Sequence, residues 1–122
     1  MFNFEKLAVW TKAIEFADLV YSMTRSFPQD ERFGLTNQMR RAAVSVASNI
    51  SEGSSRGSRI HFAQYVEVAA GSLFEVVTQA TIAKRQNFLT NDQYTAIYSA
   101  ADEQSRMLSG LQKSLRSGGS KP

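Results

Sequence analysis

Histidine, cysteine and paired carboxylates are the side chains that most often carry metal or covalent chemistry, and this chain holds few of them in a useful pattern. It has one histidine, His61, and no cysteine, which excludes disulfides and thiolate metal sites. A di-iron site in a helical bundle needs two Glu-x-x-His motifs, but the residue three before His61 is Ser58. One histidine without a supporting motif does not make a Ser-His-Asp triad. We therefore expect no catalytic residue, no metal and no cofactor.

Polar residues at helical spacing in the middle of the chain suggest a structural network instead. A hairpin turning near Arg56 would bring Arg41 beside Gly71, between two glutamates on one helix face. We predict a semi-buried Arg–Glu network there, in which buried polar groups set register and partner choice more than stability. Its members are Arg41, Asn49, Glu52, Glu67 and Glu75.

The segment 53–59, Gly-Ser-Ser-Arg-Gly-Ser-Arg, offers another kind of chemistry. Free amides at the start of the following helix, together with Arg56 and Arg59, could hold a phosphate. The same residues also suit a plain helix connection, and both interpretations stay open.

Basic residues are unevenly divided between the two ends of an antiparallel bundle. The end with residues 25–32 and 84–92 has four basic residues against three acidic ones. The end with both termini and the 53–59 loop has six basic residues against Glu5 and Glu52. Phosphate contacts, not base contacts, are expected there if the chain binds nucleic acid; otherwise this is a solvated end. The candidate contacts are Lys6, Arg56, Arg59, Lys113 and Arg116, with Lys121 in the same group.

Four segments with apolar residues at spacings of three and four must position these groups. They predict helices over about 5–25, 35–51, 59–86 and from Thr90 onward. Asn3 and Ser58 are candidate N-caps, and Thr90–Gln93 resembles a capping box. The core stripe predicted for the first helix consists of Leu7, Trp10, Ile14, Ala17 and Tyr21.

Short connections make neighbouring helices antiparallel, so we predict an all-α, antiparallel up-down four-helix bundle. Residues 1–116 form one domain in this prediction, and residues 117–122 form a flexible tail. The second and third helices have unusually few charges for helices with one solvated face. Either they pack closely through small residues or another subunit covers part of them, and the two interpretations are compatible.

Length and composition set the remaining bounds. The 122 residues suit one domain, and 43% hydrophobic residues suit a globular core. No apolar run approaches the roughly 20 residues of a membrane span, and no signal-peptide pattern occurs, so we expect a cytoplasmic protein without membrane contact. The net charge of +3 is too small for strong phosphate binding by one subunit.

One long motif resembles a known family. Glu31, Gly34, Arg40–Ala43 and Asn49–Gly53 belong to it, and Ala70–Leu73 extends it into the third helix. The chain resembles the bacterial four-helix-bundle family first described from intervening sequences in 23S ribosomal RNA genes. The resemblance implies an antiparallel bundle that assembles as a homopentamer. A related branch, the accessory variability proteins of diversity-generating retroelements, is more basic and works with nucleic acid.

Two functions follow from these observations. The first is a non-enzymatic homo-oligomer, by resemblance a pentamer, that binds RNA, DNA or a nucleoprotein through its basic end. The alternative is an oligomeric scaffold or protein-interaction module without nucleic acid. An enzyme or small-ligand binder is the third and weakest interpretation.

Overall fold

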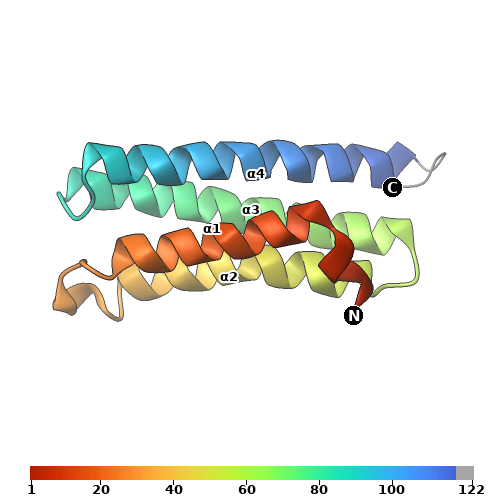
Figure 1. Ribbon diagram of the computed structural model, residues 1–122, viewed down its shortest axis with the longest axis horizontal. Coiled ribbons are helices and arrows are strands. Elements are labelled where there is room, and N and C mark those ends of the chain that lie inside the picture. Colours follow the sequence, from red (N-terminus) through yellow and green to blue (C-terminus); the bar gives the residue numbers. More distant parts are fainter. Residues whose placement is uncertain (118–122) are drawn as a thin grey trace.

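The computed structural model describes residues 1–117, which form two short 3-10 helices and four long α-helices (Figure 1). Successive long helices run in opposite directions, each packs against the next, and α1 closes the bundle against α4. The predicted all-α, up-down four-helix bundle is confirmed, and no strand occurs within residues 1–117. Of the predicted flexible tail, Ser117 is the last residue of α4; residues 118–122 lie outside the described part.

The first helix begins later than the sequence predicted. A 3-10 helix, η1 (Asn3–Lys6), comes first, and α1 (Ala8–Thr24) follows after an extended residue, Leu7. The backbone N–H of Phe2 donates to Glu5 Oε1 at 2.7 Å, which closes η1 as a separate turn. Asn3 is therefore not the N-cap, and α1 ends before Pro28, as expected.

The buried side of α1 also differs from the predicted stripe. Leu7, Trp10 and Ala17 of the predicted stripe are partly buried against the core, whereas Ile14 and Tyr21 are exposed. Apolar residues extend around much of the circumference of α1, so their spacing alone does not identify its most buried face. The residues that enter the core are Val9, Ala13, Phe16, Val20 and Thr24.

Glu31 defines the start of the second long helix. It ends the 3-10 helix η2 (Gln29–Glu31), and its Oε1 accepts from the backbone N–H of Leu35 at 3.0 Å, the first residue of α2 (Leu35–Ser54). A Cβ on Gly34 would lie 2.7 Å from that oxygen. Glycine therefore leaves room for the carboxylate to satisfy a helix N-terminal amide.

The remaining two helices begin with the predicted caps. Ser58 Oγ accepts from His61 N–H at 3.1 Å at the start of α3 (Arg59–Arg85). Thr90 and Gln93 bond reciprocally, at 2.9 and 3.1 Å, at the start of α4 (Asn91–Ser117). Between them Asn87 takes a positive φ of 65°, a conformation that asparagine tolerates better than most residues.

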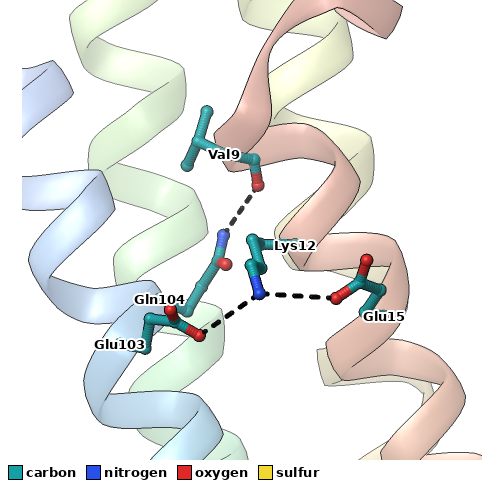
Figure 2. Close-up of polar contacts among 5 residues, drawn as sticks. All are labelled: Val9, Lys12, Glu15, Glu103 and Gln104. Atoms are coloured by element: carbon teal, nitrogen blue, oxygen red, sulfur yellow. Dashed lines mark hydrogen bonds and ion pairs between the residues drawn. The ribbon is translucent and has the colours of Figure 1, made fainter.

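The seam between α1 and α4 contains a buried amide (Figure 2). Gln104 is 2% exposed, and its Nε2 donates to the carbonyl of Val9 at 3.1 Å. Its Oε1 is buried without a partner among the described residues. At the rim of the seam, Lys12 lies 3.6 Å from Glu15 and 3.7 Å from Glu103.

The third long helix contains a long stretch with few charges. By length and composition alone α3 could cross a membrane, with a mean hydropathy of 1.2 over its most apolar window. In the bundle it packs against both α2 and α4, and core helices of bundles share such a composition. Its outer face, which we define by Val68, Gly71, Phe74 and Ile82, nevertheless stays exposed in the single chain.

Candidate nucleic-acid interface

Three separate parts of the chain meet at one end of the bundle. Figure 1 shows the N-terminus, the turn between α2 and α3, and the end of α4 at this end. They carry the predicted nucleic-acid contacts Lys6, Arg56, Arg59, Lys113 and Arg116. Lys121, predicted for the same group, lies outside the described residues. We call this surface the basic end.

Arg59 is engaged within the fold. Its Nη2 donates to the carbonyl of Ser114 at 2.7 Å, and its Nε donates to the carbonyl of Leu115 at 3.4 Å. These carbonyls belong to the last turn of α4, where helical acceptors lack intrahelical partners. Arg59 therefore ties the start of α3 to the end of α4, a structural role that sequence reasoning missed because the partners lie far apart in the chain.

Arg56 is held over an aromatic ring. Its guanidinium lies 4.9 Å from the ring centroid of Tyr65, and Nη2 donates to the Tyr65 hydroxyl at 2.6 Å. Tyr65 can stand there because Gly53 has no side chain: a Cβ on Gly53 would lie 2.6 Å from Tyr65 Cβ. The close approach of α2 to α3 thus orients an exposed cation at the turn.

The other three cations are exposed. Arg116 lies 3.9 Å from Glu67, an ion pair between two solvent-exposed groups, which contributes little to stability. Within residues 1–117, Lys6 and Lys113 form no ion pair at a distance of 4.0 Å or less.

A shallow depression of about 480 Å³ lies where α3 begins and α4 ends, and Arg59 and Arg116 both line it. Ser58 caps the helix at its rim, and Ile60 and Leu115 supply apolar walls. Two guanidinium groups beside a helix N-terminus favour an anion electrostatically. The charge of this surface therefore suits a phosphate.

The predicted Arg–Glu network is wrong for the single chain. Arg41, Glu52, Glu67 and Glu75 are all exposed, and none of the four ion pairs within residues 1–117 includes Arg41 or Glu75. Asn49 is half-buried and donates within its own helix, to Ser45.

Short side chains explain this difference. Ser45 and Ser72 share a hydrogen bond of 2.8 Å between α2 and α3, so the helices approach too closely for longer groups to lie between them. Arg41 and Glu75 instead line an open polar depression of about 420 Å³ outside this contact. Gln79 lines it too, and its buried Oε1 lacks a partner in the described part.

The remaining candidates for chemistry are a metal site and the single histidine. Within residues 1–117, no group of three or more histidine, aspartate or glutamate side chains could hold a metal ion. His61 lies at the start of α3, with Nδ1 2.9 Å from the Ser58 hydroxyl that caps the helix.

The four-helix fold agrees with the known proteins that this chain resembles. The family model described as 23S rRNA-intervening sequence protein matches residues 5–110, so the chain belongs to that family. A search among curated proteins finds no match.

Among solved structures, the chain is similar to a protein of unknown function from the S23 ribosomal protein family of Bacteroides thetaiotaomicron. The two are 26% identical with a TM-score of 0.79, and the match covers 87% of this chain and 99% of the other. The family and this neighbour thus establish the architecture and leave the activity open.

Proposed function

We propose that this protein is a non-enzymatic homo-oligomer that binds nucleic acid phosphates through its basic end. The observation that carries the proposal is the meeting of five cations from three chain segments at one end of the bundle. Phosphate contacts of this kind give affinity without sequence specificity. The proposal requires no metal or cofactor, and contact with nucleic acid suits a cytoplasmic protein.

Assembly would supply the charge that one chain lacks. A single chain carries +3, whereas five copies, the number that the family resemblance implies, would carry about +15 by simple sum. A ring with its basic ends on one side would present these cations to a single backbone. Counterion release then grows with each phosphate contacted.

The outer face of α3 is the surface that we propose a second copy covers. Val68 is 54% exposed and Phe74 is 58% exposed, and Phe74 lines two adjoining depressions between α3 and α4. Gly71 lies between them, and a Cβ there would have no neighbour within 4 Å. A glycine in the middle of a helix costs about 1 kcal/mol relative to alanine, and close packing of another copy would explain its presence.

Binding of a labelled RNA at two salt concentrations tests the proposal. We expect binding at low salt that weakens steeply as salt is added. Replacing Arg56, Lys113 and Arg116 together by alanine should weaken RNA binding at least about tenfold, because phosphate contacts are lost. Each lost contact should also make the salt dependence of the affinity shallower. Circular dichroism checks that the variant remains folded.

A matched control removes the same charge from the opposite end. Arg25, Arg32 and Arg85 replaced by alanine should leave affinity nearly unchanged. Equal losses in both triple variants would mean that only net charge matters and that the basic end is not the site. No binding of the natural chain at low salt would reject nucleic-acid binding.

The second candidate function is an oligomeric scaffold without nucleic acid, which the exposed Val68 and Phe74 on the outer face of α3 also favour. It predicts the same assembly in sedimentation, with no RNA binding at low salt. The binding measurement above therefore separates the two.

A further inference from the structure

Three aromatic rings form a stack beside the basic end. The rings of Phe2 and Phe4 are nearly parallel, with planes 4° apart and centroids 5.6 Å apart. Phe4 in turn meets Trp10 edge to face, with a centroid distance of 5.1 Å and an interplanar angle of 60°. Trp10 is half-buried against the core, so the stack leads from the core out to solvent.

The outermost ring is exposed although its backbone is held. Phe2 is 69% exposed, yet its N–H donates to Glu5 Oε1 and its carbonyl accepts from Glu5 N–H at 3.1 Å. Phe4 stacks against one face of the Phe2 ring. The opposite face is left available to another flat ring, since offset stacking uses one face at a time.

Exposed cations lie on the segments next to this stack. Lys6 is exposed in the last turn of η1. η1 packs against α2, and Figure 1 shows the N-terminus beside the turn that carries Arg56. A ring with a free face next to separate cations is the arrangement by which proteins hold single-stranded nucleic acid: the bases stack on the rings while the phosphates lie along the cations.

We propose that Phe2 stacks against an unpaired base, so that the basic end selects single-stranded nucleic acid over duplex. This inference rests on the proposed function and adds a substrate class to it. In a duplex the faces of each base are covered by the neighbouring base pairs. An unpaired base can instead unstack from its neighbours and stack against the free face of Phe2. Because every base has such a face, stacking confers little sequence preference.

The opposite end of the bundle provides a matched control. Phe33 is 83% exposed there, and the Arg32 guanidinium lies 5.4 Å from its ring centroid. It is thus an exposed phenylalanine beside an arginine, but away from the basic end. Stacking at the basic end requires that Phe2 matter for binding and that Phe33 does not.

The experiment measures fluorescence anisotropy of a labelled oligothymidylate, on the order of 15 nucleotides long, and of a duplex of the same length, with the full chain at low salt. The natural protein should bind the single strand more tightly. Phe2→Ala should weaken single-strand binding about tenfold and leave duplex binding unchanged, while Phe2→Trp retains the preference. Phe33→Ala should change neither affinity.

Trp10 gives a second readout, because it is the only tryptophan and touches the stack. Unlabelled oligothymidylate should change its fluorescence in the natural protein and much less in Phe2→Ala.

Three results would overturn the inference. The first is an unchanged single-strand affinity in Phe2→Ala, and the second is an equal loss of affinity for both probes in that variant. The third is a loss of assembly of Phe2→Ala in sedimentation, which would make Phe2 a contact between protein chains. If both probes bind equally and Phe2→Ala has no effect, the substrate class is wrong and the proposed function stands. If neither probe binds the natural protein, the proposed function itself fails.

Discussion

Gly53 occupies the point near the basic end where α2 and α3 approach each other closely. A Cβ there would lie 2.6 Å from Tyr65 Cβ and 2.9 Å from Phe62 Cδ1. We predict that Gly53→Ala lowers the free energy of unfolding by about 1–3 kcal/mol, because the helices must separate. Gly57→Ala is the control: a Cβ there meets nothing within 4 Å, so stability should stay level or rise slightly. Urea unfolding followed by circular dichroism measures both, and equal stabilities would contradict the close contact.

At this scale the sequence predicted what depends on neighbours along the chain. The caps at Ser58 and Thr90 were found because their partners lie three residues away. The role of Arg59 could not be found, since its acceptors on α4 are set only by tertiary packing. The predicted network of Arg41 with Glu67 and Glu75 assumed a wider gap between α2 and α3 than Ser45 and Ser72 leave.

Between elements, the α1–α4 seam depends on Gln104. Its amide makes one hydrogen bond, to Val9, and leaves a buried oxygen without a partner in the described part. We predict that Gln104→Leu keeps or raises the free energy of unfolding, by up to about 2 kcal/mol, because a buried unpaired acceptor is removed. Gln104→Ala should lower it by about 2–3 kcal/mol through the cavity it leaves. Urea unfolding measures both variants. If Gln104→Leu lowers the free energy of unfolding as much as Gln104→Ala does, the hydrogen bond to Val9 dominates.

Element existence and order were predictable from apolar spacing and short connections, and the bounds of α2, α3 and α4 followed closely. Which side of α1 enters the core could not be predicted, because Trp10, Ile14 and Tyr21 form an apolar stripe as plausible as the buried one. Only packing against both α2 and α4 decides which stripe enters the core. The aromatic stack of Phe2 and Phe4 likewise depends on the break at Leu7, which apolar spacing does not reveal.

For the whole molecule, the assembly that we propose depends on the outer face of α3. We predict that Val68→Gln combined with Gly71→Gln dissociates the oligomer in sedimentation velocity at micromolar concentration, since bulk and polarity replace a close apolar contact. The single chain should remain folded, because the Cβ at position 71 meets nothing and glutamine is a better helix former than glycine. Gly110→Gln, at an equally open exposed site on α4, should leave the assembly intact. A monomeric natural chain would reject the interface.

The sequence showed that the second and third helices have few charges. It did not show which of their apolar residues stay exposed. That distinction required knowing which side of α3 meets α2 and α4. The structure leaves Val68 and Phe74 exposed on the remaining side, which is why the proposed interface could be narrowed from two helices to one face.

The salt dependence of RNA affinity, compared between the natural chain and the variant with Val68→Gln and Gly71→Gln, tests whether assembly turns a weakly basic chain into a nucleic-acid binder. Both proteins carry the same charge per chain, so only pooling of the basic ends can separate them. We predict a steep fall of log affinity with log salt for the natural oligomer, and weaker binding with a shallower slope for the dissociated variant. Equal affinities and slopes, with the variant monomeric in sedimentation, would contradict this.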